Sequence, residues 1–168
     1  MRNTQIFSSE IVDRFFEKDL PYRLDMMNAF KSNIWNSPSF IDASDAVKLK
    51  ICAAESSRIV QRVFIQFMGL SVTAKKNLIN STMKMNDDVL ISDLGGFIVD
   101  PQKLSDSEKD ILVKAYVTGN KSTAHITFNS TNNTGYPEVL SLGADLINKL
   151  LKENLFDIVG REMKSYRS

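Results

Sequence analysis

The sequence predicts an α+β fold that is predominantly α-helical, formed by residues 1–168 as a single compact domain. Two observations support this prediction. Apolar residues recur at the three- and four-residue spacing of amphipathic helices over most of the chain, and helix-capping or helix-stopping residues stand at the ends of these segments. Only short stretches have the β-branched and aromatic content of strands. With 43% hydrophobic residues, a chain of this length can bury one ordinary core.

Composition and charge exclude several classes of protein. The formal net charge is +1, so the chain lacks the strong positive charge of a protein dominated by phosphate contacts. Its one cysteine, Cys52, excludes an internal disulfide, and with one histidine, His125, leaves too few ligands for a Cys/His zinc site. The sequence has neither a transmembrane-length apolar run nor a recognisable signal peptide. We therefore expect a soluble, reduced, cytoplasmic protein with no cofactor and no membrane contact.

The N-terminal part predicts three helices. Serines ahead of an apolar run predict a short helix from about residue 9, and Pro21 either ends that helix or begins the next, "YRLDMMNAFKSNIW". The longest helix is predicted over about residues 43–68, as the centre of the core, with Gly69 as its stop. The apolar positions that keep the helical period in it, and that we expect to be buried, are Val47, Ile51, Ala54, Val60, Val63, Phe64 and Phe67.

Two segments complete the first hundred residues. The segment "TAKKNLINSTMKM" predicts a weaker helix, with Leu78, Ile79, Met83 and Met85 as its apolar positions. The segment "VLISDLGGFIVD" has two interpretations: a β-hairpin with a Gly-Gly turn, or the end of a helix followed by a strand. With the three helices before them, they make residues 1–100 the helical part of the domain.

The signals become stronger after residue 100. In "LSDSEKDILVKAY", Ser105 and Glu108 form a capping box that predicts the start of a helix. The polar stretch after it predicts a strand, "TAHITF", and a turn, "NSTNNTG". Pro137 then begins a long apolar-faced helix that ends near Asn154, and "LFDIVGREM" predicts a strand that turns at Gly160.

This order of a capped helix, a polar stretch, the helix "LGADLINKLLKENLF" and a strand resembles the C-terminal part of winged helix-turn-helix domains, where a helix of the form "xxLIxKLxxxxLI" leads into the wing. The segment is similar also to the soluble tail of phage superinfection-exclusion proteins, through the capped "LSxxEKxIL" helix and a late "LxxKGIL"-like segment. The resemblance covers about residues 103–160. It implies that residues 101–168 form a winged-helix-like unit, and that the protein originates from a phage or another mobile element.

A winged-helix unit implies contact with DNA, and the candidate phosphate contacts are Lys149, Lys152, Arg161 and Lys164. Residues 121–168 carry six Lys and Arg against five Asp and Glu, so binding would need these charges sorted onto separate faces. Both lysines come late in their helix, whereas recognition helices present their N-terminal residues to the bases. A solvated C-terminal tail is the simpler interpretation of the basic cluster.

Other candidate groups have simple structural interpretations. His125 is a candidate general base or pH switch, and its structural alternative is a strand histidine without a catalytic role. Cys52 lies well inside a helix, so we expect a buried core cysteine rather than a reactive thiolate. Glu55, Arg58 and Arg62 predict an ion-pair stripe that marks the solvated side of the long helix. The pairs Asp42 with Asp45 and Asp87 with Asp88 predict helix capping rather than cation binding.

Three functions are compatible with these features, in the following order. The first is a small non-enzymatic protein that binds a protein partner or itself, through apolar surface left outside the core. The second is a dimeric winged-helix transcription regulator. The third is a small enzyme whose site is assembled from distant residues, since no local motif holds a nucleophile, a base and an orienting group.

Overall fold

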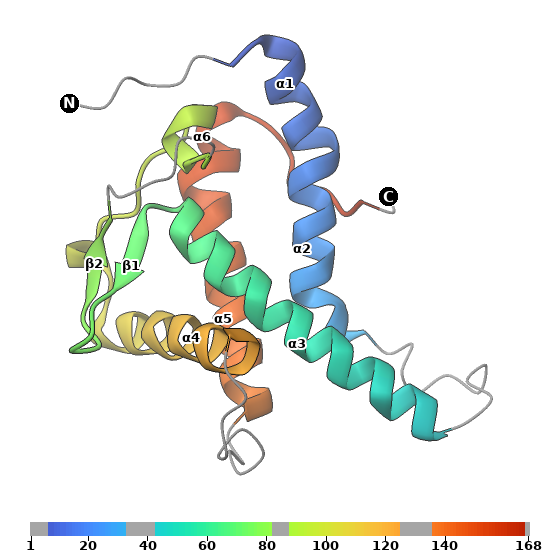
Figure 1. Ribbon diagram of the computed structural model, residues 1–168. Helices are drawn as coiled ribbons and strands as arrows, with labels where there is room; N and C mark the ends of the chain where they lie inside the picture. Colours follow the sequence, from blue (N-terminus) through green and yellow to red (C-terminus); the bar gives the residue numbers. More distant parts are fainter. Residues whose placement is uncertain (1–6, 33–42, 82–87, 125–135, 167–168) are drawn as a thin grey trace.

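The computed structural model describes residues 7–32, 43–81, 88–124 and 136–166 and confirms a predominantly helical α+β fold (Figure 1). In these residues the sheet is a two-stranded antiparallel one. The α-helices are α1 (Ser9–Arg14), α2 (Leu20–Asn28), α3 (Ala43–Phe67), α4 (Asp106–Ala124), α5 (Tyr136–Leu151) and α6 (Asp157–Val159), and the strands are β1 (Leu70–Val72) and β2 (Leu78–Asn80). Turns of π-helix, Phe15–Asp19 and Lys152–Phe156, join α1 to α2 and α5 to α6. Turns of 3₁₀-helix span Ala29–Lys31, Ile91–Leu94 and Pro101–Lys103.

The first two predicted helices form one continuous helical run. Ser8 caps its start, where the Ile11 N–H donates to the Ser8 hydroxyl. Pro21 lies inside the run, near the start of α2. A proline ring clashes with the carbonyl four residues earlier and has no N–H to donate. The run widens to a π turn just before it, in which the Leu20 N–H bonds the Phe15 carbonyl, and this extra residue accommodates Pro21 without ending the helix.

Helix α3 is the central helix, as predicted, and packs against α2, α4 and α5. Figure 1 shows it running diagonally across the molecule, with its N-terminal half extending beyond the other helices. It ends at Gly69, which has φ +78° and donates its N–H to the Gln66 carbonyl, as predicted for a glycine stop. The chain therefore reverses direction at the end of α3 and enters β1.

The helix predicted over "TAKKNLINSTMKM" is wrong for its first half, which belongs to a β-hairpin, and residues 82–85, with Met83 and Met85, lie outside the described residues. Leu70 pairs with Asn80 and Val72 with Leu78 across β1 and β2. The Thr73 N–H donates to the Asn77 carbonyl at 3.0 Å and closes the turn. The hairpin is held to the rest of the molecule by tertiary contacts: Leu70 is fully buried, and the Asn80 side chain donates to the Val99 carbonyl at 2.8 Å. These contacts outweigh a weak local preference for helix.

Residues 88–104 form neither predicted arrangement. The Ile91–Leu94 segment is a single 3₁₀ turn that ends at Gly95, whose φ is +88°. The chain beyond it is extended without joining a ladder: the Phe97 N–H donates to the Asn154 carbonyl at 2.8 Å, and the Val99 N–H to the Met68 carbonyl at 3.1 Å. This segment therefore connects the end of α3 with the π turn after α5.

The predicted capping box at the start of α4 is confirmed. The Ser105 N–H donates to Glu108 Oε2 at 2.9 Å, and the Glu108 N–H donates to the Ser105 hydroxyl at 3.2 Å. The helix continues through Gly119 to Ala124, so the start of the predicted strand "TAHITF" is helical, and its last four residues lie outside the described residues. A Cβ at Gly119 would lie 2.8 Å from the Arg58 carbonyl oxygen. This glycine permits close contact between α4 and α3, and does not stop the helix.

The predicted final strand, "LFDIVGREM", is also wrong. The helical run of α5 continues through a π turn into α6 and ends at Gly160, which has φ +67°. Leu155 and Phe156 are almost fully buried on the same side as Leu151, which holds this segment helical against the core. The described C-terminal residues therefore contain no strand where the first strand of a wing was expected.

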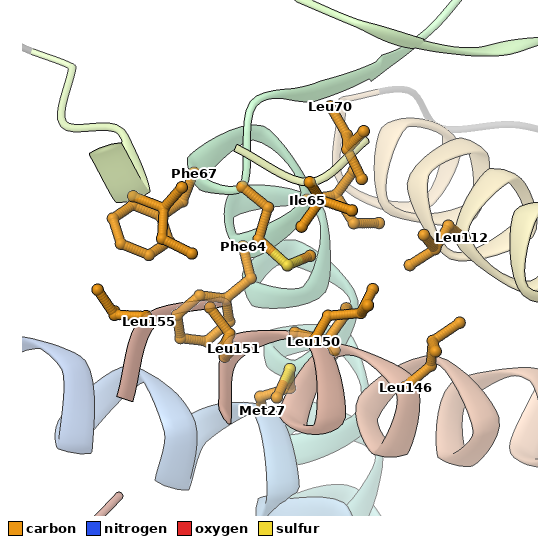
Figure 2. Close-up of a cluster of buried hydrophobic side chains, with 14 of the residues drawn as sticks. Met27, Phe64, Ile65, Phe67, Leu70, Leu112, Leu146, Leu150, Leu151 and Leu155 are labelled. Carbon is orange, nitrogen blue, oxygen red and sulfur yellow. The ribbon is translucent and has the colours of Figure 1, made fainter. Parts of the chain in front are cut away.

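One hydrophobic core joins the helices and the hairpin. Figure 2 shows side chains from α2, α3, β1, α4 and α5 meeting in a single cluster. The labelled members are Met27, Phe64, Ile65, Phe67, Leu70, Leu112, Leu146, Leu150, Leu151 and Leu155. Burying each such side chain stabilises the fold by about 1.5–3 kcal/mol relative to exposure.

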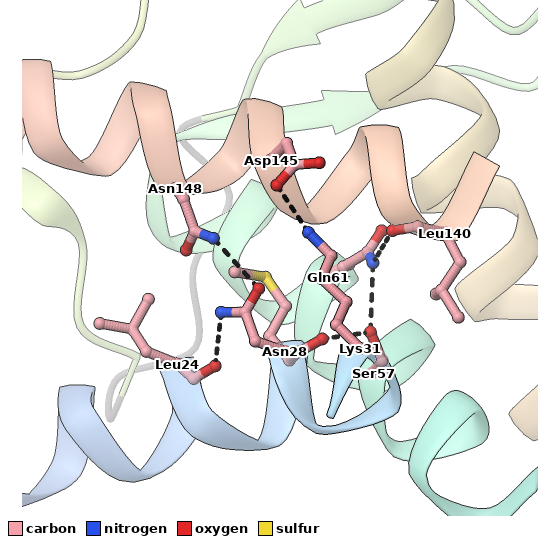
Figure 3. A network of polar contacts seen from close by, with 9 residues as sticks. Leu24, Asn28, Lys31, Ser57, Gln61, Leu140, Asp145 and Asn148 are labelled. Atoms are coloured by element: carbon pink, nitrogen blue, oxygen red, sulfur yellow. Dashed lines mark hydrogen bonds and ion pairs between the residues drawn. The ribbon is translucent and has the colours of Figure 1, made fainter. Parts of the chain in front are cut away.

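A buried polar network crosses this core (Figure 3). The Gln61 side-chain amide donates to the Ser57 hydroxyl at 3.2 Å and to the Leu140 carbonyl at 2.8 Å, and the Ser57 hydroxyl donates to the Met27 carbonyl at 2.6 Å. Gln61 and Ser57 are 1% and 0% exposed. The network therefore joins α3 to the C-terminal end of α2 and to the first turns of α5.

A second pair of contacts supports this junction at the surface. The Asn148 amide donates to Asn28 Oδ1 at 3.1 Å, and Lys31 pairs with Asp145 at 2.6 Å. Both contacts join the end of the first helical run to α5 (Figure 3).

Gly143 makes room for the Gln61 side chain, and replacing it tests the junction. A Cβ at this position would overlap Gln61 Oε1 and lie 3.2 Å from Ala115 Cβ. We expect Gly143→Ala to lower the free energy of unfolding by about 1–3 kcal/mol, although alanine is the better helix former. Urea unfolding measures this, with Ser141→Ala in the same helix as the control. A Gly143→Ala protein as stable as the wild type would contradict the packing described.

Candidate interaction surface on helix α3

The side of α3 that faces away from the core carries a row of apolar residues. Leu49, Ile59 and Val63 are 47%, 45% and 40% exposed, and Cys52 is also exposed. These positions alternate in steps of three and four residues, which is the spacing of the contact positions in a coiled coil. We name this row the α3 stripe; its members are Leu49, Cys52, Ser56, Ile59, Val63 and Gln66.

The geometry of the helix places the stripe opposite the core. With about 3.6 residues per turn, the buried positions Ser57, Gln61 and Phe64 lie on the side of α3 that faces α2 and α5. The stripe residues lie roughly half a turn away from them. The same helix therefore supplies the centre of the core on one side and an exposed apolar row on the other.

This arrangement corrects two predictions from the sequence. Val47, Ile51 and Val63 were expected in the core and are exposed, and Cys52 was expected to be buried and is exposed. The helix has apolar residues around most of its circumference, so a helical period alone fits more than one choice of buried side. The contacts with α2, α4 and α5 determine which side of α3 is buried.

The charged residues predicted to mark the solvated side of α3 lie beside the stripe and are partly covered. Arg58 pairs with Glu55, and its side chain is only 12% exposed. The Arg62 guanidinium lies over the Tyr116 ring of α4, with Cζ 5.6 Å from the ring centroid. Glu55 Oε2 and Arg62 Nε are buried atoms to which the described structure gives no hydrogen-bond partner. Two groups of opposite charge, Glu55 and Arg62, therefore lie along one edge of the stripe.

A pocket of about 500 Å³ lies at the C-terminal end of the stripe. Val63 and Gln66 belong both to the stripe and to the wall of this pocket. Phe15 and Phe67, whose rings stack with centroids 6.4 Å apart, form part of its apolar lining. Arg23 and Asp88 add charged groups to its wall. The stripe therefore runs from the protruding end of α3 to a concave site with a mixed polar and apolar lining.

Three of the four predicted phosphate contacts already pair with carboxylates. Lys149 pairs with Glu108 at 3.0 Å, and Lys152 pairs with Asp157 at 2.7 Å. Arg161 pairs with Asp13 and lies over the Phe16 ring, 4.6 Å from its centroid. Lys164 is exposed in the C-terminal segment. Two of these pairs, Lys149–Glu108 and Arg161–Asp13, thus join separate elements of the fold, and Lys152–Asp157 lies within one helical run.

The Glu108–Lys149 pair links the capping box of α4 to α5. The backbone N–H of Ser105, the Lys149 ammonium and the Ser105 hydroxyl all bond the carboxylate and lower the pKa of Glu108 from 4.5 to about 2. The same contact raises the pKa of Lys149 above 10.5. Both groups therefore stay charged at neutral pH, as the ion pair between α4 and α5 requires.

Among the described residues, the remaining candidates give no site. His125, Asp42 and Asp87 lie outside the described residues. Asp45 pairs with Lys48 at 2.9 Å on the first turns of α3. In residues 7–32, 43–81, 88–124 and 136–166, no three His, Cys, Asp or Glu side chains come together as metal ligands, and no helix has the length and hydrophobicity to cross a bilayer.

Comparison with known proteins gives no relative: the chain matches no protein-family model, no curated protein and no solved structure.

The pH dependence of stability tests the Glu108 contacts. Because the folded pKa lies below the ordinary value, the charged carboxylate stabilises the fold above about pH 4.5, and this contribution is lost as the pH falls to about 2. Glu108→Gln keeps a capping side chain and removes the charge, so we expect it to cost about 0.5 kcal/mol at neutral pH. Thermal unfolding of both proteins from pH 7 to 2 should show this difference shrinking below pH 4.5. A difference that stays constant down to pH 2 would show that the charge is not its source.

Proposed function

We propose that this chain is a non-enzymatic protein-interaction protein, and that it binds its partner through the α3 stripe. The supporting observation is the row of exposed apolar residues, Leu49, Cys52, Ile59 and Val63, on one side of a single helix. Single exposed apolar residues are common on protein surfaces, whereas several on one side of the same helix mark a contact surface. An amphipathic helix is the partner structure that matches such a row, because its own apolar positions repeat at the same spacing.

The arrangement of charge favours this function over DNA binding. A DNA-binding regulator requires a face of cations free to contact phosphates. Lys149, Lys152 and Arg161 are each engaged by a carboxylate of the same chain, and the net charge is only +1. Binding at the α3 stripe requires none of these groups.

Site-specific photo-crosslinking tests the proposed function. A photoreactive amino acid at position 59 should crosslink to a bound protein in cells that express the chain. The same group at Lys103, which lies in a 3₁₀ turn away from α3, is the control. Ile59→Glu should weaken binding of the purified partner at least about tenfold, since it places a charge in an apolar contact. Equal crosslinking at both positions, or none at 59, would contradict a role for the stripe.

A further inference from the structure

We propose that the partner of the α3 stripe is the α3 stripe of a second copy of this chain, packed antiparallel about a two-fold axis that crosses the stripe at the level between residues 57 and 58. This inference rests on the proposed function and names the partner. Three features of the structure support it: the spacing of the stripe, the charges that flank it and the pocket at its end. In a two-fold symmetric dimer the same surface of both copies forms the interface, so each contact occurs twice.

The spacing of the stripe sets the layers of the contact. The contact positions of a coiled coil are the a and d positions of each heptad. In an antiparallel pair, an a position of one helix packs opposite a d position of the other. Cys52 then lies opposite Val63 of the second copy, and Ser56 lies opposite Ile59. Leu49 lies opposite Gln66 at each end. Every exposed apolar member of the stripe is thereby covered, and the small Ser56 and Cys52 face the β-branched residues.

The charged residues beside the stripe favour this register over a shift by one heptad and over a parallel pair. With a rise of about 1.5 Å per residue, Glu55 is level with residue 60 of the second copy and about 3 Å along the axis from its Arg62. Opposite charges of Glu55 and Arg62 therefore meet twice. In the pairing one heptad away, Glu55 meets Glu55 and Lys48 meets Arg62, so like charges repel. A parallel pair brings no opposite charges together at these positions.

The pocket receives the end of the second helix. Gln66 and Val63 line it, and in this register Leu49 of the second copy lies over Gln66. A leucine side chain at that point enters a space whose lining includes Phe15 and Phe67. Leu49 lies in the N-terminal half of α3, and its side chain is 47% exposed, so it is open to contact by a second molecule. Each copy thus offers a projecting leucine and a pocket to hold one.

Disulfide crosslinking tests the register, because the chain has a single cysteine and that cysteine lies in the stripe. In Val63→Cys, each new cysteine faces Cys52 of the second copy, whereas the two positions of one chain lie too far apart along the helix to be bridged. Ile79→Cys is the matched control, since Ile79 is 42% exposed on β2. Under mild oxidation, Val63→Cys should form a covalent dimer at least about tenfold faster than the control or the wild type, with residue 52 joined to residue 63 in the peptide map.

Two results of this experiment would overturn the proposal. Rapid joining of Cys52 to Cys52 in the wild-type protein would show a parallel pair. Equal dimer formation in Val63→Cys and Ile79→Cys would show random collision.

Sedimentation equilibrium supplies the independent measurement. The wild type should pass from monomer to dimer as its concentration rises, and Ile59→Glu should remain monomeric with an unchanged thermal unfolding temperature. A wild type that stays monomeric up to about 100 μM would overturn self-association. If the photoreactive group at position 59 then captures a different protein, the interaction function stands with another partner. If it captures none, the interaction function fails as well.

Discussion

The hydrogen bonds of the buried Gln61 side chain are the interaction on which the arrangement of the helices depends. Gln61 and Ser57 together satisfy the Met27 carbonyl at the end of α2 and the Leu140 carbonyl early in α5. Each bond contributes only about 1 kcal/mol, but a buried polar group left without its partner costs about 1–3 kcal/mol. A rotation or shift of α3 would break several of these bonds at once. The network therefore fixes which side of α3 is buried.

That choice also determines what the surface of the molecule presents. With Ser57 and Gln61 facing inward, Ile59 and Val63 must face outward, because they lie about half a turn away on the same helix. Gly143 has no side chain, so the Gln61 side chain of α3 can pack directly against α5 at this position. The orientation of α3 that buries Ser57 and Gln61 is therefore also the one that exposes the apolar row.

Local signals in the sequence predicted local structure well. The capping box at Ser105 and the stop at Gly69 were both correct, because their hydrogen bonds join residues close in the chain. Features decided by distant contacts were missed: the β1–β2 hairpin depends on the burial of Leu70, and α4 continues to Ala124, into the segment predicted as a strand. The helical period of α3 could not show that Cys52 is exposed. The three- and four-residue spacing from position 49 to position 66 was the available signal for the stripe.

Cysteine scanning along α3 tests the two-sided helix most directly. In a Cys52→Ser background, single cysteines are placed at stripe positions 49, 56, 59 and 63 and at buried positions 57, 60, 61 and 64, and their reaction with a thiol reagent is followed in dilute native protein. The stripe positions should react at least about tenfold faster than the buried ones, which require local or global opening. Equal rates at both sets of positions would contradict the account of α3 as the helix that forms the core on one side and the contact surface on the other.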